Sequence, residues 1–254
     1  MKKIKLTESD LYRIVRKVLL EQEEEKRSFT FSPGSFESLI TSSSGERFVK
    51  HLNNKHDEII VNGDLDLEGT PIQSLPNNLH VKGNLYLNGC ENLKSLPDNL
   101  HVGGSLRSID TPIQSLPDNL RVGGKLNLFG CKNLQSLGDN LYVKEWLDLR
   151  ETPIQTLGDN LYVGGTLYLT GTKIQSLGDN LYVGEDLDLE GTQIQSLPDN
   201  LHVGKSLGLD YTKIKSLPDN LDVTDTIYIY GTPLNDNDKL VAKYKEKYTI
   251  NRTI

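Results

Sequence analysis

The feature that most constrains the fold of this chain is a period of about twenty residues. Pairs of apolar residues in an L-x-L frame recur at spacings of 20, 21, 20, 21, 20, 20, 20 and 20 residues. The pairs begin at Leu65, Leu85, Leu106, Leu126, Leu147, Leu167, Leu187, Leu207 and Ile227. A unit this short cannot enclose a core of its own, so each unit must bury its apolar residues against its neighbours. The period therefore predicts a solenoid.

Most units fit one template, L-x-L-x-G-T-x-I-x-S-L-P-D-N-L-x-V-x-G-x. The alternation in L-x-L, and again in L-x-V, sends the apolar side chains to one side of a strand and the intervening side chains to the other. Each unit should therefore form two short strands that stack in parallel on their equivalents, about 4.8 Å apart. The fold class we expect is mainly β, a solenoid of about nine coils of 20–21 residues.

The template resembles the leucine-rich repeat. The string "LDLEGTPIQSLP" keeps the L-x-L strand, a polar residue three positions after its second leucine, an apolar residue two further on, and the L-P ending. The resemblance covers residues 59–234 and is closest to the short repeats of bacterial and phage proteins. Threonine takes the family's Asn/Cys position in most units, and Cys90 and Cys131 take it in the two long ones. Ser108 replaces a repeat leucine and predicts a local weak spot.

Both ends of the repeat array carry candidate caps. Residues 44–58 and 235–254 each contain an amphipathic stretch with an Asn, Asp or Ser residue before it, which predicts a helix. The two apolar faces consist of Phe48, Val49 and Leu52, and of Leu240, Val241, Tyr244 and Tyr248. We expect these helices to cover the open ends of the core.

Residues 1–27 predict an amphipathic leader helix, and residues 28–43, which are rich in serine, predict a linker with little fixed structure. The apolar stripe of the leader has helical spacing and consists of Leu11, Ile14, Val15, Val18 and Leu19. Because the solenoid is already capped without it, this stripe must be buried elsewhere. It can dock on the solenoid's flank, mediate self-association, or serve as a docking helix for another protein.

The string "IKLTESDLYRIVRKVLLE" looks like a leader found on proteins of tailed phages and of gut or marine bacteria. It is also similar in layout to the capsid-targeting leaders of internal head proteins, which a protease removes after an L-x-E motif. Leu19, Leu20 and Glu21 fit that motif. The resemblance implies packaging in a virion, a capsid or other virion protein as partner, and processing after Glu21.

Composition excludes several other classes of function. The net charge of -7 disfavours nucleic acid as a partner. No apolar run approaches the about 20 residues that span a bilayer, and no secretory signal is recognisable, so we expect a cytoplasmic protein without a membrane partner. Two cysteines are too few for a disulfide framework.

The sequence does not predict an enzyme. His80, His101 and His202 share one repeat position, which is typical of surface decoration, and no third ligand completes a metal site. Bacterial effectors with similar repeats that act as ubiquitin ligases use a separate C-terminal domain, which this sequence does not contain after its last repeat. We therefore expect no catalytic residue, no cofactor and no metal ion.

The informative positions are those that vary within the repeat. Acidic residues occupy the outward positions near both ends of the L-x-L array, whereas cationic, aromatic and apolar side chains gather at its centre. The predicted partner-binding residues are Tyr86, Arg107, Ile109, Lys125, Phe129, Trp146, Arg150 and Tyr168. Because Trp, Tyr and Arg dominate interface hot spots, we interpret the chain as a protein-recognition scaffold that binds through a central concave face. The alternatives are a glycan-binding surface and a structural component of a virion.

Overall fold

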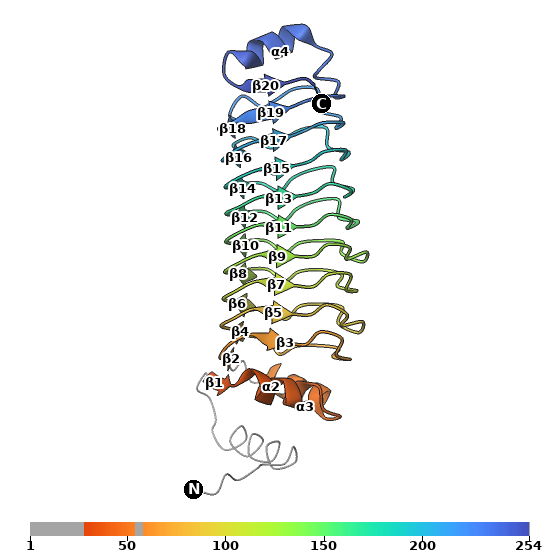
Figure 1. The fold of residues 1–254 in the computed structure, drawn as a ribbon, viewed down its shortest axis with the longest axis vertical. Helices are drawn as coiled ribbons and strands as arrows, with labels where there is room; N and C mark the ends of the chain where they lie inside the picture. Colours follow the sequence, from red (N-terminus) through yellow and green to blue (C-terminus); the bar gives the residue numbers. More distant parts are fainter. Residues whose placement is uncertain (1–27, 54–57, 254) are drawn as a thin grey trace, which may run out of the picture.

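The structure, a computed structural model, describes residues 28–53 and 58–253. The predicted leader helix, with its apolar docking stripe and its processing motif at Leu19 and Glu21, lies outside the described residues. Within them the chain winds into a single column of stacked coils (Figure 1). The predicted parallel solenoid is therefore confirmed, and its leucine-lined coils have a leucine-rich-repeat-like fold.

Each coil contributes one strand to each of two parallel sheets. The sheet built from the L-x-V segments, here called the L-x-V sheet, contains β1 (Ser28–Phe31), β2 (Glu58–Val61), β4 (Leu79–Val81), β6 (His101–Val102), β8 (Arg121–Val122), β10 (Tyr142–Val143), β12 (Tyr162–Val163), β14 (Tyr182–Val183), β16 (His202–Val203) and β18 (Asp222–Val223). The L-x-L sheet contains β3 (Leu65–Asp66), β5 (Leu85–Tyr86), β7 (Leu106–Arg107), β9 (Leu126–Asn127), β11 (Leu147–Asp148), β13 (Leu167–Tyr168), β15 (Leu187–Asp188), β17 (Leu207–Gly208), β19 (Thr226–Tyr228) and β20 (Thr249–Asn251). Equivalent residues of successive coils are register partners, as Leu126, Leu147 and Leu167 are.

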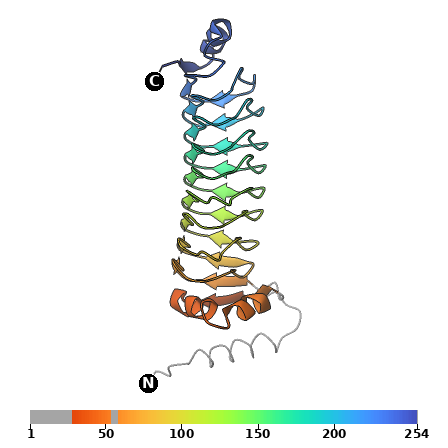
Figure 2. The ribbon, with the colours of Figure 1, turned by 90° about the vertical axis from the view of Figure 1, so that its right-hand side faces the viewer.

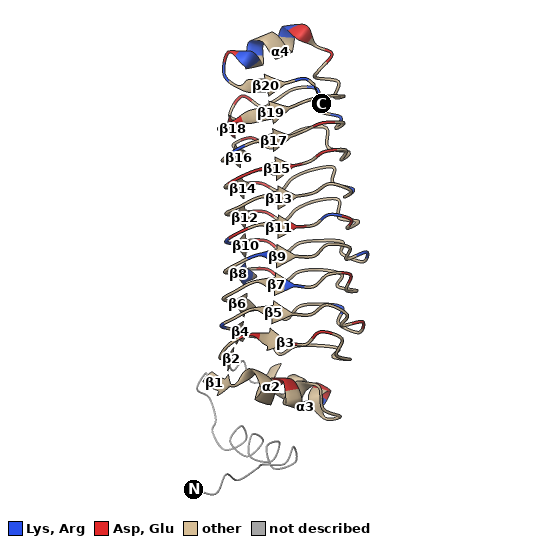
Figure 3. Ribbon diagram, in the orientation of Figure 1, with Lys and Arg blue, Asp and Glu red and all other residues tan. Residues whose placement is uncertain are grey.

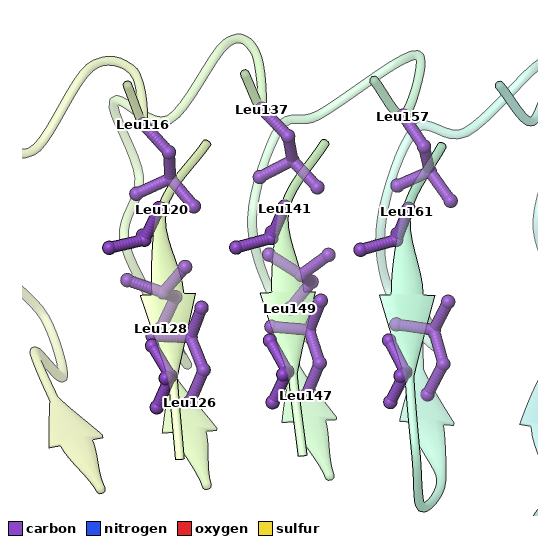
Figure 4. Close-up of a cluster of buried hydrophobic side chains, with 14 of the residues drawn as sticks. Leu116, Leu120, Leu126, Leu128, Leu137, Leu141, Leu147, Leu149, Leu157 and Leu161 are labelled. Atoms are coloured by element: carbon purple, nitrogen blue, oxygen red, sulfur yellow. The ribbon is translucent and has the colours of Figure 1, made fainter. Parts of the chain in front are cut away.

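The core is a stack of leucine layers between the two sheets. Leu126, Leu128, Leu147 and Leu149 are fully buried, and in Figure 4 the equivalent leucines of successive coils lie side by side. Each such side chain contributes about 1.5–3 kcal/mol when removed from water. Because these layers are the same in every coil, the repeat sequence follows from the stacking.

Polar side chains inside the coil satisfy the backbone where the chain leaves the L-x-L strand. Threonine hydroxyls donate to the carbonyl oxygen three residues earlier at 2.6 to 2.8 Å in the coils of Thr70, Thr152, Thr172, Thr192, Thr212 and Thr232. Buried backbone acceptors need such a partner. The threonine ladder is therefore structural.

Ser108 is accommodated by a small buried polar cluster. Its hydroxyl lies 2.8 Å from the Thr111 hydroxyl, and the Cys131 thiol of the next coil donates to the Ser108 carbonyl oxygen at 3.0 Å. The side chain of Ser108 is fully buried. The buried hydroxyl that replaces the leucine is therefore satisfied by Thr111 of its own coil, whereas the thiol contact to the backbone also occurs between Cys90 and Leu67, where the leucine is present.

The two walls of each coil explain the shape of the column. The L-x-V and L-x-L walls of each coil are both β-strands. Because the strands of both sheets stack at the same spacing of about 4.8 Å, the column has the same length along both faces. The coils consequently form an almost straight column (Figures 1 and 2). The face predicted to be concave is flat, and we call it the L-x-L face.

The prediction that residues 28–43 form a linker is wrong. β1 pairs in parallel with β2, and α2 (Pro33–Ile40) follows it. Ser32 caps this helix by accepting a hydrogen bond from the backbone of Ser35, and α2 buries Phe36, Leu39 and Ile40. The serines thus serve as helix caps around an apolar i, i+3, i+4 face, and the segment is part of the cap.

The next helix, α3 (Gly45–Asn53), completes the N-terminal cap. It buries the predicted apolar residues Phe48, Val49 and Leu52. The helices α2 and α3 lie together below the first coils in Figure 1. The open end of the leucine stack is therefore covered by two helices.

The C-terminal end is closed by a helix and a strand. The helix α4 (Asp238–Lys245) begins after the Asn237 cap, and β20 then adds a tenth strand to the L-x-L sheet. The Tyr248 hydroxyl donates to the Leu221 carbonyl oxygen at 2.6 Å, and the Tyr244 hydroxyl accepts from Leu217 N and donates to Leu217 O at 3.0 and 3.1 Å. These hydroxyls replace the hydrogen bonds that a further coil would make.

Removing one of these hydroxyls should loosen the C-terminal end. We expect Tyr244→Phe to lower the free energy of unfolding by about 1–2 kcal/mol, because it leaves a buried donor and acceptor of Leu217 without a partner. Urea unfolding followed by circular dichroism measures this. The matched control is Tyr182→Phe, which removes a hydroxyl from an exposed ring; equal losses in both variants would contradict the capping role.

Candidate functional site

The candidate site lies on the L-x-L face. Because the leucines of each L-x-L pair point inward, the residue between them and the residues flanking them point outward. The register places Arg107 beside Asn127, then Asp148, then Tyr168 on successive strands. Side chains that are about twenty residues apart in the sequence thus become neighbours on the surface.

Five of the eight predicted partner-binding residues form one group, here called the central cluster: Lys125, Phe129, Trp146, Arg150 and Tyr168. The Lys125 ammonium lies 5.4 Å from the centre of the Trp146 ring. The Arg150 guanidinium lies 5.7 Å from the Phe129 ring centre and 5.0 Å from that of Tyr168. Trp146 and Tyr168 meet edge to face at 6.5 Å. Cations and rings therefore alternate over three coils.

Asp148 anchors the central cluster, a role that the repeat pattern does not predict. Its side chain is 5% exposed and accepts from Arg150 Nε at 3.0 Å and from Nη2 at 2.7 Å. The Arg150 backbone N–H also donates to it, at 3.0 Å. These hydrogen bonds raise the pKa of Arg150. The spacing of two residues along a strand, which puts both side chains on the same face, is the signal that could have revealed the pair.

The other three predicted residues lie on the two preceding coils. Tyr86 and Arg107 are register partners on β5 and β7. The Ile109 backbone N–H donates to the Asn88 side chain at 2.8 Å, and its own side chain is partly buried. These residues extend the same face toward the N-terminal cap.

The L-x-V sheet carries an aromatic ladder. Tyr142, Tyr162, Tyr182 and His202 stack with ring centres 4.5 to 4.9 Å apart and nearly parallel planes. His202 Nδ1 ends the ladder 2.6 Å from Asp222 Oδ2. The spacing of the ring centres matches the spacing of the strands, so the faces of each ring contact the rings on neighbouring strands. We assign the ladder to sheet stability.

Other chemistry finds little support in the described parts of the chain. No three His, Cys, Asp or Glu side chains between residues 28 and 253, excluding 54–57, are grouped to hold a metal ion. The same part of the chain contains no helix with the length and hydropathy of a membrane span. Cys90 and Cys131 are free and buried, and burial raises the pKa of both thiols, which makes the reactive thiolate scarce.

Comparisons with known proteins do not add a function. No protein-family model, curated protein or solved structure matches the chain significantly. One fold can support many unrelated functions, so the leucine-rich-repeat-like architecture does not by itself define one. A function must therefore be inferred from the side chains of the L-x-L face.

Breaking the pair at the base of the central cluster should destabilise the coil. We expect Arg150→Met to lower the free energy of unfolding by about 1–3 kcal/mol, because the buried Asp148 carboxylate loses its charged partner. The matched control is Lys132→Met, which breaks an exposed pair with Glu151 and should cost less than about 0.5 kcal/mol. If both variants unfold at the same urea concentration, Asp148 is not the anchor.

Proposed function

We propose that the protein is a non-enzymatic recognition scaffold that binds a protein partner through the central cluster. The observation that carries the proposal is the set of cation–ring contacts around Trp146 and Arg150, on a face that is open to solvent. Phe129 within this set is 36% exposed. Aromatic and arginine side chains bury a large area on binding and still offer polar contacts, so they dominate interface hot spots.

The cluster is also organised before any partner arrives. Arg150 is held by the buried Asp148, and Lys125 by the face of Trp146. Ordering such a long side chain on binding costs about 0.5–1.5 kcal/mol of free energy. Here the side chains are already held in place by the fold, so much of that cost does not arise on binding. A rigid sheet that presents fixed side chains suits recognition without a conformational change.

The charge of the cluster indicates what the partner presents. Lys125 brings positive charge to its coils and Arg107 to the preceding coil, and neither residue has a salt bridge among the residues that the structure describes. Figure 3 shows basic residues at β7 and acidic residues beside β3 and β15. A partner surface with acidic and apolar residues would complement the centre of the face.

A glycan is the second candidate, because Trp146 and Tyr168 expose ring surface on which a sugar can stack. The flatness of the L-x-L face favours a protein partner over a glycan. Small-ligand sites are usually concave, and the cavity of about 520 Å³ lined by Lys132, Gln155 and Lys173 lies on the loop side of the coils instead. A flat surface is more typical of protein interfaces.

The proposal predicts that one substitution removes partner capture. Wild-type protein, Trp146→Ala, Lys125→Glu and Tyr182→Ala would each be immobilised and exposed to a lysate of the source cells. We expect wild type and Tyr182→Ala to retain a common protein that Trp146→Ala and Lys125→Glu lose at least tenfold. Tyr182→Ala is the matched control, because it removes an exposed aromatic ring from the opposite sheet.

Two results would contradict the proposal. One is retention of the same proteins by Trp146→Ala as by wild type, with unchanged folding by circular dichroism. The other is a glycan array on which wild type binds a sugar that Trp146→Ala does not, without any captured protein. That second result would establish the glycan reading.

We propose a separate role for residues 1–27, as a docking helix that directs the column of coils to a capsid or another virion protein. The support is the apolar stripe from Leu11 to Leu19 and the motif that ends at Glu21, both in the sequence. Deleting residues 1–27 should abolish co-purification with particles, whereas Trp146→Ala should not. Intact residues 1–21 in purified particles would contradict processing after Glu21 and leave packaging standing.

A further inference from the structure

The outward side chains of the L-x-V sheet follow an order that is complementary to itself when it is reversed. From β8 to β18 they are register partners, here called the six-residue column: Arg121, Tyr142, Tyr162, Tyr182, His202 and Asp222. A cation lies at one end of the column, four rings lie in its middle, and an anion lies at the other end. Figure 3 shows the basic residue at β8 and the acidic residue at β18.

Contacts within the chain hold the two ends of the column against the rings. The Arg121 guanidinium lies 5.8 Å from the centre of the Tyr142 ring, and His202 Nδ1 lies 2.6 Å from Asp222 Oδ2. Because the stacked rings contact one another through their faces, the column presents ring edges and tyrosine hydroxyls to the outside. The side chains are therefore ordered before any contact with a partner.

The charged ends of the column remain accessible. Arg121 is exposed and has no salt bridge among the residues that the structure describes. The Asp222 side chain is 66% exposed although one of its oxygens contacts His202. Each end can therefore accept a charged partner.

The strip beside the rings is free of side chains. Gly164 and Gly184 follow Tyr162 and Tyr182 by two residues, on the same face of the coil. A Cβ atom at Gly164 would collide with the carbonyl oxygen of Lys144, and one at Gly184 would collide with that of Gly164. The coils also stack without marked curvature (Figure 2). A second flat sheet can therefore approach this face closely.

A second copy of the chain fits this face when it is turned upside down. A two-fold axis parallel to the strands, between β12 and β14, places β8 opposite the partner's β18, β10 opposite β16, and β12 opposite β14. Arg121 then faces the partner's Asp222, and the same axis repeats this pair at the other end. Rings face rings at the four positions between. Every position of the column is matched, which a contact with an unrelated protein would not require.

The aspartates of the preceding turns do not point across such an interface. Asp118, Asp139 and Asp159 each accept the backbone N–H of the equivalent aspartate in the next coil at 2.9 Å. Their carboxylates therefore lie along the stack of coils and at the rim of the strip, where water screens their charge.

We propose that the protein forms a reversible antiparallel homodimer through the six-residue column. Six strands at about 4.8 Å and a width of about five residues at about 3.3 Å give about 480 Å² per copy, or about 950 Å² in total. Stable interfaces bury about 1,200–2,000 Å², so this dimer is weak and depends on concentration. It leaves both L-x-L faces exposed, so the inference does not rest on the proposed function.

The test follows the mass of the full chain by analytical ultracentrifugation, at concentrations up to about 1 mM. We expect wild type to interconvert between monomer and dimer. Arg121→Asp and Asp222→Arg should each raise the dissociation constant of the dimer by about tenfold or more, because each places two pairs of like charges in the interface. The matched control is Lys82→Asp, which reverses a charge beside β4, outside the six strands, and should leave the constant unchanged.

Restoring the charge pairs separates a contact from a folding defect. An equimolar mixture of Arg121→Asp and Asp222→Arg should form a heterodimer, because each chain then meets opposite charges at both ends. The chain with both substitutions should dimerise within about threefold of wild type. A misfolded variant would dimerise in neither case.

Three results would overturn the proposal. One is a full chain that stays monomeric up to about 1 mM. Another is a dimer that both single variants form as tightly as wild type, which would place the contact on another surface, such as residues 1–27 or the L-x-L face. The third is a loss of dimer in the single variants that neither the mixture nor the double variant restores.

Discussion

The rest of the structure depends on the stacking of leucine layers at the spacing of parallel strands. A coil of about twenty residues buries its leucines only against the coils above and below it, so every inward position must repeat for the stack to continue. Leu126, Leu147 and Leu167 are register partners for this reason. The outward positions carry no such demand, and the chain can change them coil by coil. The inward residues therefore hold the stack together, and the outward residues of the same strand are free to vary.

An open stack creates a second demand, because its last strands present unpaired backbone groups. The protein meets it with elements that belong to no repeat. β1 adds a strand to the L-x-V sheet at one end, and β20 adds one to the L-x-L sheet at the other. At the C-terminal end Tyr244 and Tyr248 use their hydroxyls where a further coil would have used its backbone. Tyrosine side chains can make these hydrogen bonds because the bonds are needed only at this end of the column and not in every coil.

The sequence predicts whatever follows from alternation and period: the two strands of each coil, their register, and which side chains face outward. The sequence does not predict features that come from a segment outside the repeat, or from the relative spacing of the strands in the two sheets. The segment of β1 and α2 has the composition of a linker, although Phe36, Leu39 and Ile40 are buried there. The flatness of the L-x-L face comes from two walls of equal spacing. Asp148 was visible as one of many acids, but its burial under Arg150 depends on the neighbouring coils.

A strict repeat also gives a physical way to decide which exceptions concern function. Ser108 breaks the leucine pattern, but the Thr111 hydroxyl satisfies its hydroxyl from within the core, so the molecule itself explains it. Tyr211 is compensated as well, because its ring lies against Gly231 of the next coil and meets Tyr230 edge to face at 5.4 Å. Exceptions that the packing repairs in this way do not by themselves indicate a ligand.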